Sequence, residues 1–370
     1  EAARIEQLRR HLLDLFKVHG YQYVIPPTLE YIESLITGTG HDLDLATFKV
    51  VDQLTGRLMG IRADMTPQAA RIDAHMLNQQ GVCRLCYAGT VLRTKPDGLA
   101  RTREPLQIGA ELFGHAGIES DVEIQRLMIK SLQLLGLNQL HIDFSHVAIF
   151  ESLVKAGNID ADLEQALYGA LQSKDKAAVA GLAKELDPII QQALLNLTEL
   201  NGDIGVLDLA LKVLPKLPEI TQALANLSAV ANKLSDLNVQ ISFDLGELRG
   251  YHYHSGIVFA AYAQGYTGPV ALGGRYDEVG VAFGRARPAT GFSVDLRGIV
   301  ATLPPTHLPK AILAPEDNNP TLLAKIEALR AEGLVVIQVL PHTQVSAVEL
   351  NCDSALVMRD GEWRIEALKH

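Results

Sequence analysis

The chain has 370 residues, more than a single ordinary core holds, so about two or three domains are expected. Its 48% hydrophobic and 21% charged residues are typical of a globular protein, and a net charge of −10 counts against DNA or RNA as the main partner. Three cysteines and the lack of a long apolar run favour a cytoplasmic protein with neither disulfides nor a membrane span. Since the chain begins at Glu1, we also expect a native N-terminal stretch to be missing.

Residues 1–145 mix helical and β-like patterns. Apolar residues at helical spacing predict an opening helix, and runs bounded by glycine or proline predict strands after it. The predicted elements are, in order, a helix stopped by Gly20, a strand broken by Pro26 and Pro27, β-like pieces around a Thr55-Gly56 turn, a helix with Thr66 as N-cap and Pro67 at its first position, a strand on each side of a basic loop, a helix at 119–136 and a strand at 139–144.

From about residue 146 to 237 leucine and alanine dominate, and the pattern predicts several amphipathic helices in place of strands. β-like runs return with "VQISFDLGELRGYHYHSGIVFAAYA", and "ALGGRYDEV" is interpreted as a glycine-rich turn. After the Pro-rich segment "LPPTHLPK" at 303–310, the pattern predicts a βαβ unit and a hairpin that turns at Asp360-Gly361.

Together these elements predict an α+β fold. Residues 1–145 and 240–302 are expected to form one domain with a mixed, mostly antiparallel sheet and flanking helices. Residues 146–239 are expected to form a helical insertion in it, and residues 308–370 a small C-terminal α/β domain. Because antiparallel sheets can leave one face uncovered, such a sheet can offer that face to a ligand.

The basic loop lies in "VLRTKPDGLARTREPLQIGAELFG", and most such charges are simply solvated. Arg93, however, is predicted to end the strand before the loop, while Gln107 and Glu111 lie on one face of the strand after it. A cation, an amide and a carboxylate that converge on one face suit a zwitterionic amino acid, so we favour a binding site. The cations of this stretch are Arg93, Lys95, Arg101 and Arg103.

The segment "ELRGYHYHSGIVF" supports two further hypotheses. If it is a strand, His252 and His254 share a face and could bind a metal ion, but no third ligand is evident, so we disfavour this hypothesis. Arg249 followed by Gly250 lets a carboxylate approach the guanidinium closely and accept two hydrogen bonds from it. A surface arginine beside a bulge glycine is the structural alternative.

Two other patterns favour structural interpretations or stay open. In a strand, the thiols of Cys83 and Cys86 point to opposite faces, which favours core packing over a zinc site or a redox pair. The run "GGRYD" at 273–277 could bring backbone amides near an anion or simply turn a corner, and the sequence does not choose between these.

Taken in order, these segments resemble the catalytic core of histidyl-tRNA synthetase, a class II aminoacyl-tRNA synthetase. "GYQYVIPPTLE" is similar to motif 1, with Pro27 at the motif proline, and "RTKPDGLARTREPLQIGAELFG" resembles motif 2 and the strand after it. "LRGYHYHSGIVF" resembles the histidine-specific signature, and "GGRYDEV" with "PATGFSVDLRGIV" resembles motif 3. The resemblance covers most of residues 1–145 and 240–302, and the order and spacing of the motifs make it specific.

The resemblance implies that the histidine pocket of the family is largely retained. Asp64 stands where the family has glutamate, and His254 replaces the second tyrosine of the signature, whereas the other pocket residues match. The implied histidine-binding residues are Glu111 for the imidazole, Asp64, Thr66 and Gln107 for the ammonium, Arg249 for the carboxylate, and Tyr253 and His254 beside them.

The ATP half of the family's site carries over poorly. Motif 2 has Arg-x-Glu, for the α-phosphate and the adenine amino group, whereas the triplet here is Arg93-Thr94-Lys95. Motif 3 ends in Gly-Leu-Glu-Arg, whereas here Arg297 comes one position early and Gly298 takes the place of the arginine, a displacement that turns a helical side chain by about 100°. The resemblance therefore implies a degenerate nucleotide site at Arg93, Lys95 and Arg297, and no catalytic residues.

This degenerate site and the short C-terminal segment resemble the regulatory subunits of the short-form ATP phosphoribosyltransferase, which acts in the first step of histidine biosynthesis. The resemblance implies a non-catalytic subunit without cofactor or metal that binds free L-histidine. It also implies self-association and a hetero-octamer with the short-form catalytic subunit, which histidine inhibits and the histidine-free regulatory subunit activates. The alternatives are an active histidyl-tRNA synthetase-like enzyme that forms histidyl-adenylate and, less favoured, a metal-binding protein.

Overall fold

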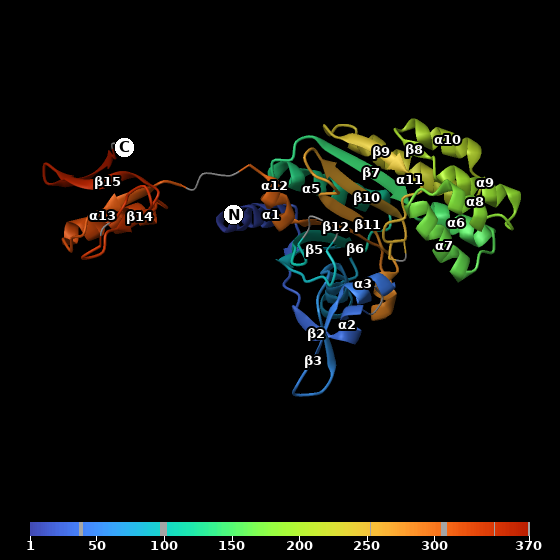
Figure 1. Ribbon diagram of the computed structural model, residues 1–370, viewed down its shortest axis with the longest axis horizontal. Helices are drawn as coiled ribbons and strands as arrows, with labels where there is room; N and C mark the ends of the chain where they lie inside the picture. The colour runs from blue at the N-terminus through green and yellow to red at the C-terminus, as the bar shows by residue number, and fades with distance from the viewer. Residues whose placement is uncertain (37–39, 97–101, 252, 305–308, 344, 369–370) are drawn as a thin grey trace. The chain divides into compact units, whose positions relative to one another are not determined.

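The computed structural model describes residues 1–370 except 37–39, 97–101, 252, 305–308, 344 and 369–370 (Figure 1). By their internal contacts, the described residues separate into two compact units, Glu1–Leu303 and Pro304–His370. Each unit has buried apolar residues of its own.

The larger unit is built on a mixed sheet. Its described strands are β1 (Gln22–Tyr23), β5 (Cys83–Thr90), β6 (Leu106–Phe113), β7 (Leu140–His146), β8 (Asn201–Gly202), β9 (Gln240–Asp244), β10 (Ile257–Ala263), β11 (Ala271–Arg275) and β12 (Ala289–Asp295). They lie in the order β1-β5-β6-β12-β11-β10-β7-β9-β8. Among these strands, β1 pairs parallel with β5 and β7 with β9, and the other neighbours are antiparallel. The predicted mixed, mostly antiparallel sheet is confirmed.

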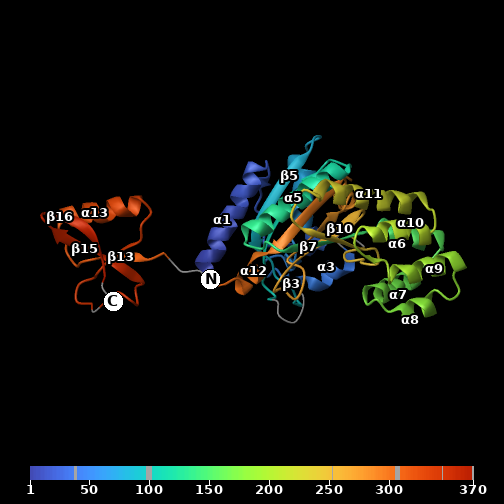
Figure 2. The same cartoon turned by 90° about the horizontal axis from the view of Figure 1, so that it is seen from above.

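One face of this sheet is covered by α1 (Ala2–Val18), α5 (Ile118–Leu134) and α11 (Pro218–Leu234) (Figure 2). Side chains alternate along β6, so Ile108 and Leu112 pack into the apolar core beneath these helices. Gln107 and Glu111 therefore point to the opposite face of the sheet. The site residues gather on that opposite face.

A smaller sheet follows β1 and contains the predicted β-like pieces. Its described elements are β2 (Leu29–Tyr31), α2 (Ile32–Ile36), α3 (Gly40–Ala46), β3 (Phe48–Val51) and β4 (Leu58–Ile61), and its strand order is β2-β4-β3. β3 and β4 pair antiparallel around the Thr55-Gly56 turn, as predicted. The chain then leads from β4 to the next helix.

Thr66 begins that helix but does not cap it. α4 (Thr66–Arg71) includes Thr66 as its first residue, and the cap position is Met65. The backbone N–H of Thr66 donates to the carboxylate of Asp64 at 2.8 Å, so Asp64 satisfies the hydrogen bond that an N-cap would satisfy. The N-cap prediction is therefore wrong, although Pro67 lies in the first turn as expected. The helix continues as a π-helical segment, η1 (Ile72–Leu77).

The Leu- and Ala-rich stretch is helical, as predicted. Its helices are α6 (Ala148–Ala156), α7 (Ala161–Gln172), α8 (Lys176–Leu182), α9 (Pro188–Leu197), α10 (Gly205–Val213) and α11. A short strand, β8, interrupts them and pairs with β9 at the edge of the main sheet. Buried leucines of these helices, such as Leu167 and Leu194, belong to the same apolar cluster as Phe144 and Phe259 of the sheet, so the helices and the sheet share one core.

The segment "ALGGRYDEV" is not a turn, which corrects the prediction. Ala271–Arg275 forms strand β11 between β10 and β12, and the short helix η2 (Val279–Phe283) follows it. A Cβ atom at Gly273 would lie 2.5 Å from the ring of Phe259, so this glycine serves close packing within the sheet. Since Gly273 and Gly274 pair with both neighbouring strands, this segment belongs to the sheet rather than to an anion-binding loop.

The segment that carries the two histidines is likewise not a strand. β10 begins at Ile257, and the chain before it turns at Gly250, which has φ +67°. The carbonyl oxygen of Gly250 accepts hydrogen bonds from the N–H groups of Tyr253 and His254. A shared strand face for His252 and His254 is therefore wrong, because glycine permits a turn there, and His252 itself lies outside the described residues.

The smaller unit has the predicted βαβ unit and hairpin. Its described elements are β13 (Ala311–Ala314), α13 (Pro320–Ala331), β14 (Val336–Gln338), β15 (Cys352–Arg359) and β16 (Glu362–Ala367), with strand order β14-β13-β15-β16. β15 and β16 join at Asp360 and Gly361, both with positive φ, as the Asp-Gly signal predicts. Leu322 and Ile326 of α13 pack into the core of this unit.

Cys83 and Cys86 are buried on opposite sides of β5. Cys83 belongs to one apolar cluster and Cys86 to another, which confirms their assignment to core packing. Burial raises the pKa of each thiol to about 12, so both stay protonated. In the part of the chain that the structure describes, no helix has the length and apolar character needed to cross a bilayer.

Candidate functional site

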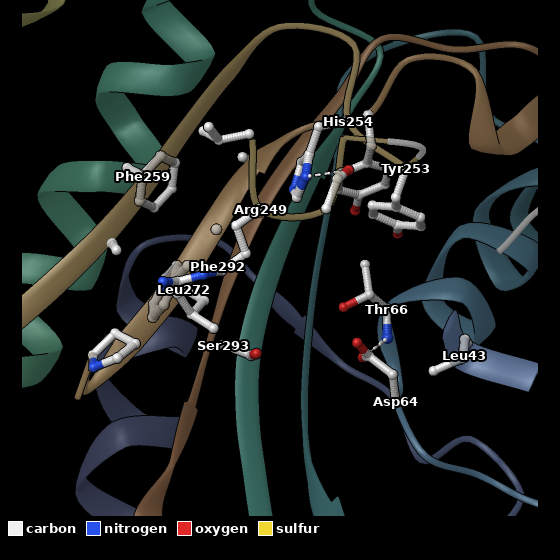
Figure 3. A pocket seen from close by; sticks show the side chains of 18 of the residues that line it. Leu43, Asp64, Thr66, Arg249, Tyr253, His254, Phe259, Leu272, Phe292 and Ser293 are labelled. Carbon is white, nitrogen blue, oxygen red and sulfur yellow. Dashed lines mark hydrogen bonds between the residues drawn. The ribbon is translucent and has the colours of Figure 1, made fainter. Parts of the chain in front are cut away.

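A cavity of about 1400 Å³ opens on the sheet face opposite α1 and α5 (Figure 3). Its floor includes a row of directly opposed residues on neighbouring strands, because the strand registers align Ser145, Val258, Gly274, Gly291 and Glu111. The loop between β4 and α4 lines one side, and the turn before β10 lines another. The sheet therefore brings together segments that are far apart in the sequence.

Two residues of this row are glycines, and a Cβ atom at either would collide with a side chain of the site. A Cβ atom at Gly291 would overlap the carboxyl group of Glu111. A Cβ atom at Gly274 would lie 2.5 Å from the ring of His254. The glycines thus leave room for polar groups to lie close to the backbone of the floor.

Glu111 is fully buried between two tyrosines. The hydroxyl of Tyr87 donates to its Oε1 at 2.8 Å, and the hydroxyl of Tyr276 donates to its Oε2. Burial raises the pKa of Glu111 to about 8, although these hydroxyls partly oppose the rise. A carboxyl group that titrates near neutral pH is suited to share a proton with a weakly basic ring nitrogen.

Asp64, Thr66 and Gln107 form one hydrogen-bonded network, as their assignment to a common site implies. Asp64 Oδ1 accepts from the backbone N–H of Thr66 and from Gln107 Nε2, both at 2.8 Å. Gln107 Oε1 accepts from the backbone N–H of Met65 at 2.9 Å, and Gln107 Nε2 also lies 3.2 Å from Ser293 Oγ. Asp64 and Thr66 line the cavity, and the buried Gln107 holds Asp64 from behind.

Arg249 and Tyr253 bring hydrogen-bond donors to the cavity. The backbone N–H of Arg249 donates to Glu247 Oε1 at 2.8 Å, and its Nη2 lies 3.5 Å from Glu247 Oε2. Nη1 of Arg249 and the hydroxyl of Tyr253 are buried and have no hydrogen-bond partner among the described residues. Because buried polar groups are normally paired, these two donors suit a ligand that supplies acceptor oxygens.

His254 lies over the floor with a neutral ring. Its Nδ1 is 3.1 Å from the carbonyl oxygen of Gly250, and burial lowers its pKa to about 4. Within the described residues, no group of three or more His, Cys, Asp and Glu side chains is placed to hold a metal ion. His252, the second residue of the metal hypothesis, lies outside that part of the chain.

The cationic residues assigned to the nucleotide half are dispersed. Arg93 and Lys95 line the cavity, and Arg93 Nε donates to the carbonyl oxygen of Ala63 at 3.3 Å. Since β5 stops at Thr90, the prediction that Arg93 ends that strand is wrong by a few residues. Arg103 stacks over Phe48 at 4.9 Å, and Arg101 lies outside the described residues.

Arg297 is directed elsewhere. It lies at the start of α12 (Leu296–Thr302) and pairs with Glu104 at 3.0 Å, with both side chains partly exposed. Among the described residues, Arg297 is not one of those that line the cavity. The predicted set of Arg93, Lys95 and Arg297 therefore does not converge on one point.

Sequence reasoning missed Tyr87 and Tyr276, which hold Glu111, and Glu247, which holds Arg249. The alternation of β5 gives a signal for Tyr87, because it places Tyr87 on the same face as Gly89, which pairs with Gln107. Tyr276 belongs to the "GGRYD" run, which was interpreted from its glycines alone. Glu247 gives no signal in the sequence that sets it apart from other surface acids.

The chain is similar to known proteins along nearly its whole length. A family model described as histidyl-tRNA synthetase matches residues 1–299, and one described as ATP phosphoribosyltransferase subunit HisZ C-terminal domain matches residues 309–366. The ATP phosphoribosyltransferase regulatory subunit of Methylobacillus flagellatus is 66% identical over 99% of this chain and 95% of that protein. The chain belongs to the ATP phosphoribosyltransferase regulatory subunit family. The regulatory subunit of Nitrosospira multiformis is 55% identical over 99% of this chain and 94% of its own length.

Solved structures agree with this regulatory-subunit family and its synthetase-like fold. A structure from Bacillus halodurans, described as an ATP phosphoribosyltransferase regulatory subunit/histidyl-tRNA synthetase, has a TM-score of 0.84 at 27% identity and covers 95% of this chain and 93% of its own. Histidyl-tRNA synthetase from Nostoc has a TM-score of 0.78 at 19% identity over 99% of this chain and 94% of its own, which shows the shared fold alone. The expected class II synthetase-like fold is confirmed.

Proposed function

We propose that this member of the regulatory subunit family binds free L-histidine in the cavity. Binding of histidine there changes the activity of the catalytic subunit of ATP phosphoribosyltransferase. The regulatory role follows from the family, since relatives more than half identical to this chain are regulatory subunits of that enzyme. The observation that supports the ligand is the pair of unpartnered buried donors, Arg249 Nη1 and the Tyr253 hydroxyl, in a cavity whose other walls carry carboxyl groups.

In the proposed complex each part of histidine meets a group of complementary chemistry. The carboxylate accepts hydrogen bonds from Arg249, and the ammonium donates to Asp64 and Thr66. Gln107 supports the ammonium site by fixing Asp64. The imidazole ring contacts the carboxyl group of Glu111, which lines the cavity. A site that matches each of these polar groups discriminates strongly, because a ligand that lacks one leaves a buried partner unpaired.

We further propose that the chain forms no histidyl-adenylate. Lys95 puts an ammonium where the synthetases have a carboxylate, and Arg297 is paired with Glu104 instead of lining the cavity. Stabilisation of phosphate charge is the main protein contribution to such chemistry, and the loss of one fixed charge contact costs about 3 kcal/mol of barrier. The remaining cations are therefore insufficient for adenylate formation.

The regulatory complex is the second part of the proposal. We expect this chain to form a hetero-octamer with the short-form catalytic subunit, to activate it without histidine and to inhibit it with histidine. A coupling of about 1–3 kcal/mol between the two sites would produce such control. Gel filtration with light scattering of the mixed subunits gives the stoichiometry, and phosphoribosyltransfer assays with and without histidine give the sign of the effect.

Histidine binding and adenylate formation are tested on the isolated chain. Isothermal titration calorimetry should show saturable binding of L-histidine, and it should show none of L-alanine, which lacks the ring. Incubation with ATP, histidine and labelled pyrophosphate should give no label in ATP. Sustained histidine-dependent exchange would favour the alternative that the family model over residues 1–299 raises, an active synthetase-like enzyme.

A further inference from the structure

His254 is held in one tautomer by the turn that carries it. Its Nδ1 lies 3.1 Å from the carbonyl oxygen of Gly250. A carbonyl oxygen can only accept a hydrogen bond, so Nδ1 must carry the hydrogen. Burial lowers the pKa of His254 to about 4, and the ring is therefore neutral at physiological pH. Nε2 is consequently an acceptor and not a donor.

This acceptor and the carboxyl group of Glu111 border the same part of the floor. A Cβ atom at Gly274 would lie 2.7 Å from His254 Nε2, and a Cβ atom at Gly291 would overlap the carboxyl group of Glu111. Gly274 and Gly291 are directly opposed on β11 and β12, and neighbouring strands lie about 4.8 Å apart. A ligand ring that meets Glu111 therefore lies next to His254 Nε2.

We propose that His254 is a specificity-determining residue that accepts a hydrogen bond from a ring N–H of the ligand. This inference rests on the proposed histidine site and names the atom that His254 recognises. Histidine supplies two ring nitrogens, so one can donate to His254 while the other meets Glu111. A bound ring without N–H would cover His254 Nε2 without giving it a hydrogen-bond donor.

The replacement of tyrosine by histidine is what makes this position selective. A tyrosine hydroxyl can donate or accept, so it pairs with a ring nitrogen in either protonation state. His254 lacks this freedom because the Gly250 carbonyl fixes its tautomer. The structure thus requires an N–H donor from the ligand at this position.

The test compares L-histidine with β-(thiazol-4-yl)-L-alanine, whose five-membered ring has the same shape but sulfur in place of the N–H. Both affinities are measured by calorimetry at pH 7.5 on the full chain and on the His254→Phe variant. The quantity compared is the affinity for histidine divided by the affinity for the thiazole analogue. This ratio should be about tenfold to a hundredfold larger in the unaltered chain than in His254→Phe, because phenylalanine offers no acceptor that the thiazole ring could leave unpaired. Effects of the missing N–H on Glu111 are present in both proteins and cancel in this ratio.

Two further variants show that the effect belongs to the acceptor. His254→Gln can place an amide oxygen near the position of Nε2 and should keep most of the discrimination, whether or not His254→Phe folds well. His146→Gln is the matched control, because His146 is a buried histidine whose pKa burial also lowers to about 4, but it is not among the described residues that line the cavity. It should keep the full preference for histidine.

The outcomes separate this inference from the proposed function. If the unaltered chain does not bind histidine, the proposed function fails. If it binds histidine but His254→Phe leaves the preference over the thiazole unchanged, the histidine site stands and the role of His254 is wrong. The same conclusion follows if His254→Gln loses the preference as fully as His254→Phe while thermal melts show both variants folded.

Discussion

We call the part of the cavity that is proposed to bind histidine the amino-acid end, and the region of the residues assigned to the degenerate nucleotide site the nucleotide end. The two are built in different ways. At the amino-acid end, Glu111 accepts hydrogen bonds from Tyr87 in β5 and from Tyr276, which directly follows β11. Asp64 accepts hydrogen bonds from the first residue of α4 and from Gln107 of β6. At the nucleotide end, Lys95 is exposed on a loop, and Arg297 pairs with Glu104 at a partly exposed position. One end is therefore preorganised by the sheet, and the other is not.

This difference separates what the binding of a small ligand requires from what catalysis requires. Recognition of a small ligand needs buried groups fixed at short distances, because each unpaired group costs affinity. Catalysis needs in addition that charges converge on the reacting phosphates. The proposed sensor requires only the first condition, and only the first condition is met by the geometry of the described residues.

The largest effect is expected for Arg249→Ala. The ligand carboxylate then loses a charged, two-pronged partner, and histidine affinity should fall by at least about a hundredfold. Calorimetry with L-histidine measures the loss. Arg297→Ala is the matched control at the other end of the comparison and should leave the affinity unchanged. If the two variants behave alike, the assignment of the amino-acid end is wrong.

A smaller effect, on stability, is expected for Glu111→Gln. The pKa of Glu111 is about 8 in the folded protein, whereas its ordinary value, which applies to the unfolded chain, is 4.5. As pH rises, the unfolded chain therefore loses this proton at a lower pH than the folded protein does. The stability of the ligand-free protein should therefore fall as pH rises from about 4.5 to 8. Glutamine does not titrate, so the variant should gain about 1–3 kcal/mol relative to the unaltered chain at pH 8 while it binds histidine more weakly.

Urea unfolding at pH 5 and pH 8 measures this gain without ligand. The difference between Glu111→Gln and the unaltered chain should be larger at pH 8 than at pH 5. Glu104→Gln, at the nucleotide end and exposed, should show no such dependence on pH. Equal differences at both pH values would mean that Glu111 is charged throughout this range.

Patterns with a short period were sufficient to predict most of the fold. The runs on each side of the basic loop predicted β5 and β6, helical spacing predicted α1 and the helices between residues 146 and 237, and Asp360-Gly361 predicted the last hairpin. Glycines misled in two places because a glycine can serve packing as well as turning. Gly273 lies in a strand against Phe259, whereas Gly250 makes a turn where a strand was predicted.

Only those residues of the candidate site that belong to the recognised motifs were predictable. Asp64, Thr66 and Gln107 were assigned together and do form one network. The alternation of β5 gives the face on which Tyr87 lies but not its contact with Glu111, because that contact depends on the register between strands. Tyr276 follows β11, whose pairing with β12 no local pattern gives. The direction of Arg297 was likewise beyond the motif, because its partner Glu104 lies on a different segment.

The smallest effect is expected for Lys95→Glu, which restores the residue type that the synthetases have at this position. Lys95 is exposed and belongs to the nucleotide end, so histidine affinity should change by no more than about twofold. Pyrophosphate exchange should still be absent, because Arg297 remains directed to Glu104. A large loss of histidine affinity would place Lys95 at the amino-acid end, and a gain of exchange would show that a single charge separates this chain from an active enzyme. Either result would remove the contrast between the two ends of the cavity.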